Sequence, residues 1–200
     1  SRALATVDAE NVIIDGNQVT LTTPGSAIDL GGIAKGYIAD QMKAYLNSQG
    51  ITSGLIDLGG NILALGPKEH QDTASYTIGI QKPFSDDGDP IAAIEVTDQS
   101  VVTSGNYQRY FESDGVLYHH ILDTATGYPC DNGLASVTII NNSSVDGDAL
   151  STTCFAMGLT DGLAFAESLP DTEAIFITTD GELHCTSGIG TAIPFLDLSS

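Results

Sequence analysis

The chain has 200 residues, of which 26 are acidic and 6 are basic, giving a formal net charge of −20 at pH 7. This charge argues against a nucleic-acid partner and against an acidic membrane surface, because binding to either depends on clustered Lys and Arg. Hydrophobic residues make up 42% of the chain, which excludes a charge-driven disordered tail. The length suits one domain, or two very small ones, with a sizeable core.

No apolar run approaches the roughly 18 residues that span a bilayer, and the first four residues, SRAL, lack a signal-peptide pattern. We therefore expect any export signal to have been removed or to lie upstream. The three cysteines, Cys130, Cys154 and Cys185, match neither a metal knuckle nor a disulfide framework, so the redox compartment stays open.

The first half of the chain predicts a hairpin, a helix and two strands. In residues 12–19 an Asp-Gly pair joins alternating apolar residues, which is typical of a hairpin. From residue 33 to about residue 49 apolar side chains recur at three-to-four spacing, which predicts a helix that Gly50 caps. Alternating apolar residues at 76–80 and 94–96 predict strands.

The second half predicts two further hairpins, one buried strand and two helices. The hairpins are expected at residues 111–117 and 175–183, each around an Asp-Gly pair, and the strand at 137–140. The helices are expected at 148–157 and 161–168. Strands before, between and after the helices favour an α+β fold, mostly antiparallel sheet, over a doubly wound parallel sheet.

Glycines stand directly before the first predicted helix, in residues 29–37. Such a turn exposes backbone N–H groups to an anionic ligand, and Lys35 places a positive charge in the first helical turn, where it is mildly unfavourable for the helix itself. The segment matches neither the P-loop nor the GxGxxG pattern, so a phosphate cradle and a plain helix start both stay open. Asp-Leu-Gly-Gly recurs at 57–60, and two unrelated glycine turns are favoured over a repeat.

Two further segments carry residues suited to an anionic ligand or to proton transfer. Arg109 lies between two tyrosines, where it could pair with phosphate while a tyrosine stacks on a planar ring; an edge strand with Arg109 over the tyrosine faces is slightly favoured. His119 and His120 point to opposite faces if they lie on a strand, so at most one enters a given site. Histidine suits a base near neutral pH, although a structural histidine is the commoner case.

Asp148 and Thr152 stand four residues apart on a predicted helix and therefore share a face. Together they offer a carboxylate and a hydroxyl, and oxygen-only ligands select Mg²⁺ or Ca²⁺ rather than zinc. A calcium loop starting at Asn142 fails, because Thr153 stands where the bidentate Glu is required. An Asp cap on a helix of small residues is the structural alternative.

In their order and spacing, five motifs of this chain resemble those of the ApbE-type flavin transferases. The matching motifs are DLGGIAKGY at 29–37, DLGGN at 57–61, TSGNY at 103–107, HILD at 120–123 with TGYP at 126–129, and DALST at 148–152. The resemblance covers the chain from about residue 10 to its end. It implies an ApbE-like, T-fold-like core of mostly antiparallel sheet with a few packed helices, and one catalytic domain over residues 1–200.

The resemblance also implies a chemistry and a set of site residues. The implied enzyme takes FAD, uses Mg²⁺, and joins FMN through a phosphoester bond to a Thr or Ser hydroxyl of an acceptor protein, releasing AMP. The implied metal ligands are Asp148, Thr152 and the backbone carbonyl of Gly32. The implied FAD contacts are Asp29, Lys35 and the backbone of Leu122, and His120 is the implied base. We add Arg109 as a phosphate contact, from its own segment.

Displacement at a diphosphate needs charge neutralisation and an in-line nucleophile, which a metal and a base supply without a covalent enzyme intermediate. No nucleophilic Ser or Cys is therefore required, and Cys154 is expected in the core. An acidic pocket with little fixed positive charge is expected to need Mg²⁺ in order to hold FAD.

Members of the family are longer at the N-terminus, so we expect a truncated or proteolytic fragment with weakened FAD binding and an exposed apolar face where the missing part would pack. The resemblance further implies an extracytoplasmic protein, anchored to the membrane as a lipoprotein in its full-length form. Two other functions stay open: a Mg²⁺-dependent FAD pyrophosphatase that yields FMN and AMP, and a non-catalytic flavin- or metal-binding fragment.

Overall fold

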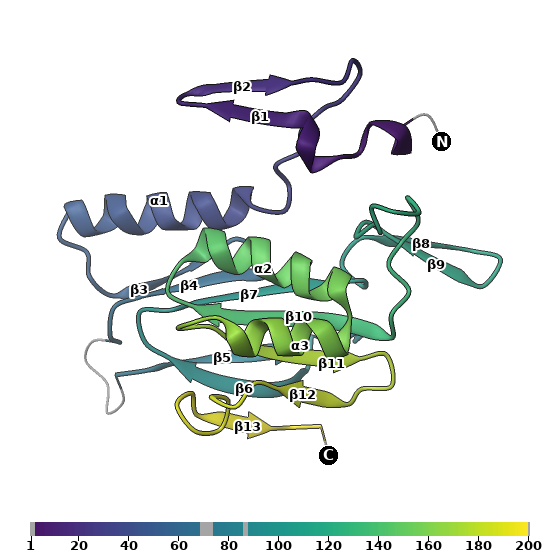
Figure 1. Cartoon of the computed structure of the whole chain (residues 1–200). Coiled ribbons are helices and arrows are strands. Elements are labelled where there is room, and N and C mark those ends of the chain that lie inside the picture. The colour runs from purple at the N-terminus through teal and green to yellow at the C-terminus, as the bar shows by residue number, and fades with distance from the viewer. Residues whose placement is uncertain (1–2, 69–73, 86–87, 200) are drawn as a thin grey trace.

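A computed structural model describes residues 3–68, 74–85 and 88–199, which form three layers (Figure 1). The middle layer is a six-stranded antiparallel sheet in the order β12-β11-β10-β7-β4-β3. In chain order its strands are β3 (Gly54–Asp57), β4 (Asn61–Leu65), β7 (Ser100–Gly105), β10 (Leu134–Asn141), β11 (Glu173–Thr178) and β12 (Leu183–Cys185).

Helices cover one face of this sheet and a second, smaller sheet covers the other. The helices are α1 (Ala34–Ser48), α2 (Ser144–Met157) and α3 (Leu159–Ser168). The small sheet has the order β13-β6-β5 and comprises β5 (Tyr76–Gln81), β6 (Pro90–Val96) and β13 (Phe195–Asp197). Because both faces of the middle sheet are covered, all 8 residues of its central strand β10 are buried.

Two separate hairpins stand outside these layers. One joins β1 (Val12–Asp15) to β2 (Gln18–Leu21) after two short 3₁₀ turns, Leu4–Thr6 and Ala9–Asn11. The other joins β8 (Tyr110–Ser113) to β9 (Val116–His119) and projects from the end of the sheet (Figure 1).

The α+β architecture and the predicted hairpins, strands and helices are confirmed. The start of α2 differs from the prediction: it begins at Ser144, because Ser143 caps it by accepting a hydrogen bond from the Asp146 N–H at 3.3 Å. Asp148 therefore lies in the second turn and is buried, so the Asp-cap alternative is wrong. Four strands, β3, β4, β7 and β13, were not predicted: β3 and β13 have only 4 and 3 residues, and β4 and β7 carry buried residues in succession rather than in alternation.

The backbones of α1 and α2 lie close together where α1 packs on the first turn of α2. A Cβ atom placed on Gly36 would lie only 2.2 Å from the carbonyl oxygen of Ser144 and 2.6 Å from the Cα of Val145. No residue with a side chain fits there without a shift of the α2 backbone. Glycine at this position therefore allows α1 to lie directly against α2.

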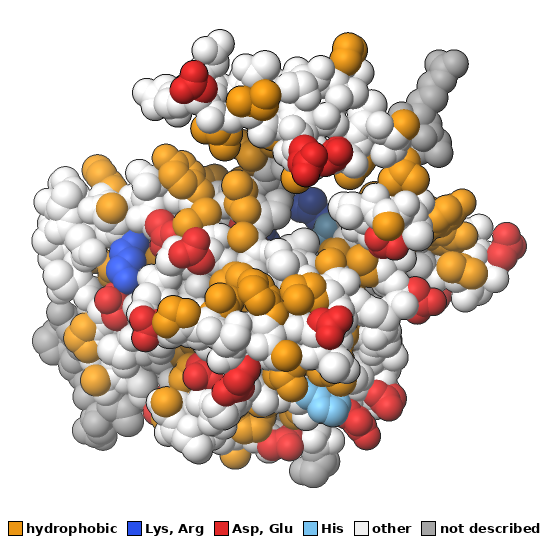
Figure 2. Space-filling view, viewed as in Figure 1, with side chains coloured by type: hydrophobic (Ala, Val, Ile, Leu, Met, Phe, Trp, Pro, Cys, Tyr) orange, Lys and Arg blue, Asp and Glu red, His pale blue; other side chains and the backbone are white. Residues whose placement is uncertain are grey.

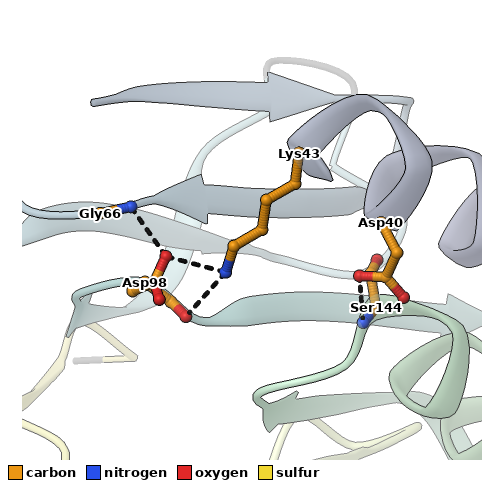
Figure 3. Close-up of polar contacts among 5 residues, drawn as sticks. All are labelled: Asp40, Lys43, Gly66, Asp98 and Ser144. Carbon is orange, nitrogen blue, oxygen red and sulfur yellow. Dashed lines mark hydrogen bonds and ion pairs between the residues drawn. The ribbon is translucent and has the colours of Figure 1, made fainter. Parts of the chain in front are cut away.

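A second set of contacts ties α1 to the sheet, as Figure 3 shows. The Lys43 Nζ lies 2.8 Å from Asp98 Oδ1, which also accepts a hydrogen bond of 2.8 Å from the Gly66 N–H. Partial burial raises the pKa of Asp98, but the hydrogen bonds from Lys43 and Gly66 and the Lys43 charge lower it by more, so the net pKa is below its ordinary value. One of the six cations is thus used to hold the helix.

The outward side of α1 and the edge strand β3 present an exposed apolar face, visible as orange side chains along the helix in Figure 2. Its members are Tyr37, Ile38, Met42 and Tyr45 on α1, and Leu55 on β3, all at least 40% exposed. An exposed apolar face was expected from the sequence. Within the described ranges, no helix is long and apolar enough to cross a membrane.

The crossing predicts the effect of Gly36→Ala. Alanine has the higher helix propensity, yet its methyl group would collide with the α2 backbone, so we expect a net loss of roughly 1–3 kcal/mol in the free energy of unfolding. Urea denaturation measures the change. Gly54→Ala is the matched control, because a Cβ there meets no atom within 4 Å; equal stabilities of the two variants would contradict the close crossing.

Candidate active site

A cleft of about 1320 Å³ lies beside the N-terminal end of α1, one side of α2 and the turns that follow β3 and β7. Figure 2 shows a recess beneath the N-terminal hairpin with Lys or Arg and His side chains inside it. The eight residues singled out from the sequence all line this one cleft: Asp29, Gly32, Lys35, Arg109, His120, Leu122, Asp148 and Thr152. Segments that are more than a hundred residues apart in the chain thus meet at one place.

The two Asp-Leu-Gly-Gly segments lie together at the cleft and make the same local hydrogen bond. Asp29 Oδ1 accepts from the Gly31 N–H at 2.7 Å, and Asp57 Oδ1 accepts from the Gly59 N–H at 2.8 Å. Lys35 Nζ joins the two turns by donating to the Gly59 carbonyl at 2.8 Å. Only the second turn has glycines at positive φ, which is 70° for Gly59 and 79° for Gly60. The two turns therefore differ in backbone conformation.

Asp148 reaches the cleft from α2 and is fixed by α1. Its Oδ2 accepts a hydrogen bond of 2.9 Å from the Gly36 N–H in a buried contact, and the residue is only 4% exposed. Its Oδ1 forms no hydrogen bond with any residue in the described ranges. One carboxylate oxygen is therefore held in place while the other remains available to a ligand.

Thr152 lies one helical turn after Asp148, and its Oγ1 is 3.1 Å from the Oγ of Ser104 on β7. A Cβ atom placed on Gly32 would lie 4.0 Å from the same Oγ1, so the turn before α1 approaches this hydroxyl. Asp148 and Thr152 on α2 and Gly32 in the turn before α1 thus converge, with oxygen as the only donor atom type.

These donors fit Mg²⁺, which proteins commonly hold through one or two carboxylates while the ion keeps waters and binds substrate phosphates. In the part of the chain that the structure describes, no three His, Cys, Asp or Glu side chains form a metal-binding cluster. A cation here would consequently depend on a single carboxylate, a hydroxyl and a backbone carbonyl.

His119 and His120 face opposite sides, as predicted for adjacent residues at the end of a strand. His119 is buried: its Nδ1 accepts from the Ile121 N–H at 3.3 Å, so Nε2 carries the proton and donates to the Cys130 carbonyl at 3.0 Å. Burial lowers the pKa of His119 by more than the hydrogen bond to Cys130 raises it. His119 is therefore a neutral structural residue.

His120 lines the cleft and is exposed. Its Nδ1 lies 3.3 Å from the Arg109 carbonyl oxygen, which can only accept a hydrogen bond. The proton of the neutral ring must then be on Nδ1, which leaves Nε2 unprotonated and able to accept a proton. Of the two adjacent histidines, only His120 has the position and the tautomer of a base.

Arg109 follows β7 in the turn that leads to β8, so the edge-strand alternative is wrong. β7 ends at Gly105 and lies inside the sheet between β10 and β4. The neighbouring tyrosines pack against Phe84 instead, with ring centroids 5.8 Å away for Tyr107 and 5.9 Å for Tyr110. Arg109 itself lines the cleft.

Three lining residues had no assigned role at the level of the sequence. Ser104 forms a hydrogen bond with Thr152, a contact that arises only because α2 packs on β7 in the fold. The Ala125 N–H and the Thr126 hydroxyl lower the pKa of Asp123, so this side chain adds a carboxylate to the cleft. Burial raises the pKa of the Cys130 thiol, which keeps it protonated at neutral pH.

The other buried cysteine, Cys154, is fully buried in the core, as expected, and burial raises its pKa to about 11. Neither buried cysteine therefore offers a thiolate nucleophile.

Comparison with known proteins finds a matching family and relatives that are named FAD:protein FMN transferase. The model of the ApbE family matches residues 1–176. The FAD:protein FMN transferase of Klebsiella pneumoniae (strain 342) is 45% identical over 92% of this chain and 56% of its own length. The protein of the same name from Treponema pallidum (strain Nichols) is 41% identical over 90% of this chain and 51% of its own length.

Solved structures agree with the sequence matches. The ApbE protein of Thermotoga maritima superposes with a TM-score of 0.83 at 36% identity, over 93% of this chain and 60% of that one. The flavin transferase ApbE of Vibrio cholerae gives a TM-score of 0.79 at 34% identity, over 92% and 58%. The chain spans little more than half the length of these relatives, and it belongs to the ApbE family.

Proposed function

We propose that this chain carries the catalytic site of a Mg²⁺-dependent FAD:protein FMN transferase. The observation that carries the proposal is the convergence of an oxygen-only donor set, Asp148, Thr152 and Gly32, with the base-competent His120 in one cleft. The names of the relatives, FAD:protein FMN transferase, support the same reaction.

Different residues of the cleft would hold the metal, pair with the phosphates and position the rest of FAD. When bound, Mg²⁺ would supply charge neutralisation at the diphosphate of FAD, held by Asp148, Thr152 and the Gly32 carbonyl. Lys35 and Arg109 place two cations in the same cleft, where they pair with phosphate oxygens. Asp29 and the backbone of Leu122 position the rest of FAD.

His120 acts on the acceptor. Its Nε2 accepts the proton of a Thr or Ser hydroxyl as the hydroxyl oxygen attacks the phosphorus of the FMN half. A P–O bond to the acceptor forms, the P–O bond to the bridging oxygen breaks, and AMP leaves. The exposure of His120 also lets water take the place of the acceptor, which would make the chain a pyrophosphatase releasing free FMN.

We also propose that the reaction with the acceptor takes place outside the cytoplasmic membrane, and that the full-length protein is anchored to the membrane as a lipoprotein. This proposal is supported by the resemblance to the family alone.

The first test follows the fate of the flavin. We expect the chain, FAD and Mg²⁺ to yield a flavin-labelled acceptor when a Thr-bearing acceptor protein is present, and Asp148→Ala to lower the rate by roughly 100-fold or more, because a metal supplies several kcal/mol to the transition state. In-gel flavin fluorescence and chromatography of FMN and AMP measure both products.

Asp146→Ala is the matched control, since Asp146 is exposed on the same helix and lies outside the cleft. Free FMN with an unlabelled acceptor would indicate the pyrophosphatase. Absence of both products would favour a non-catalytic binding module, and an unchanged rate in Asp148→Ala would refute its metal role.

The second test concerns the base. His120→Ala should lower the transfer rate by about 10²–10⁴-fold and leave FAD affinity nearly unchanged, because general base catalysis acts on the acceptor proton. Steady-state rates and FAD titration separate the two effects. His184→Ala, at a histidine on β12 outside the cleft, provides the comparison; equal rates for both variants would rule out His120 as the base.

A further inference from the structure

We propose that Asp40 is a positioning residue for the metal site: through the first turn of α2 it sets the place of Asp148. This inference rests on the proposed function, in which Asp148 holds the metal. Asp40 itself does not line the cleft.

Asp40 makes two hydrogen bonds from α1 to the beginning of α2, and Figure 3 shows its side chain pointing toward Ser144. Its Oδ1 accepts from the Ser144 N–H at 3.0 Å and its Oδ2 from the Val145 N–H at 2.9 Å. N–H groups in the first turn of a helix have no partner within the helix, and a negative charge at this end is favourable. The carboxylate therefore satisfies two such groups at once.

A reciprocal contact runs in the other direction one helical turn away. The Gly36 N–H of α1 donates to Asp148 Oδ2 of α2 at 2.9 Å. Gly36 and Asp40 are one turn apart on α1, and Ser144 and Asp148 are one turn apart on α2. Each helix thus offers a backbone segment to a carboxylate of the other, and the two contacts together fix how far α2 lies along α1.

The sheet beneath α2 also contacts this first turn. Ser144 Oγ donates to Asn61 Oδ1 at 2.8 Å, but Asn61 Nδ2 and Ser100 Oγ, both fully buried, have no partner among the residues that the structure describes. Ser143, the residue before the helix, already caps α2, because its Oγ accepts a hydrogen bond from the Asp146 N–H. The Asp40 carboxylate is an addition to this cap from another helix, and its two charge-assisted bonds act on where α2 lies.

Loss of this contact should change the metal site more than the fold. If the first turn of α2 shifts, Asp148 and Thr152 move with it relative to Gly32, which is on the α1 side. Groups that orient metal ligands typically contribute 10- to 100-fold to metal affinity.

The test is titration of the 200-residue chain with MgCl₂ in the absence of FAD, followed by calorimetry, for the wild type, Asp40→Asn and Asp146→Asn. Both substitutions remove one negative charge near the same helix end, so their charge effects match. In Asp40→Asn an amide NH₂ faces a backbone N–H, and we expect Mg²⁺ to bind about 10- to 100-fold more weakly. Asp146→Asn should stay within about twofold of the wild type.

A second readout separates positioning from general destabilisation. FAD turnover by Asp40→Asn should approach the wild-type kcat at saturating Mg²⁺, with the loss confined to the apparent KM for the ion, because the ligands themselves are intact. Should Asp40→Asn not fold, Asp40→Glu carries the same expectation, since it keeps the charge and displaces the carboxylate by one methylene.

Equal Mg²⁺ affinity in Asp40→Asn and Asp146→Asn, with binding abolished in Asp148→Ala, would overturn the role of Asp40 and leave the proposed function standing. A kcat that stays low at saturating Mg²⁺ would overturn it as well. Wild-type Mg²⁺ affinity in Asp148→Ala would instead contradict the metal site of the proposed function, and the inference would fail with it.

Discussion

The contact on which the rest of the structure depends is the crossing of α1 over the first turn of α2. Glycine at position 36 lets the two backbones meet, and its buried N–H donates a hydrogen bond to one oxygen of Asp148. Without this approach, the glycine turn before α1 and the donors of α2 would not face the same cleft. One missing side chain thus couples helix packing to the assembly of the site.

The net charge of the chain is −20, and the charged residues that line the cleft differ from this average. Lys43 is used to hold α1 against Asp98, whereas Lys35 and Arg109 line the cleft. Asp29, Asp123 and Asp148 line it as well, so the fixed charges there do not favour a diphosphate. Surface carboxylates more than about 10 Å away are screened at ordinary salt, so the residues that line the cleft set its charge. This charge supports the proposal that a divalent cation links the cleft to phosphate.

The sequence predicted the fold class, the hairpins and the ends of α1, because Asp-Gly turns and helical periodicity are local signals. Seven of the eight predicted residues that line the cleft came from the order of the motifs rather than from any single motif, and Arg109 came from its own segment; their roles stay predictions. The sequence did not predict that α2 starts at Ser144, although the Ser143 cap is a local signal, and the two hydrogen bonds from Asp40 to that end appear only in the folded chain. The tautomer of His120 likewise depends on the Arg109 carbonyl, a contact that only the folded chain brings about.

The most direct measurement of the central claim is the affinity of the chain for FAD with Mg²⁺ and in excess chelator. A cleft whose phosphate binding depends on a cation held by Asp148, Thr152 and Gly32 should bind FAD with Mg²⁺ and lose at least about tenfold in affinity without it. Fluorescence or calorimetric titration gives both constants under matched ionic strength. Equal FAD affinity in the two conditions would contradict the account.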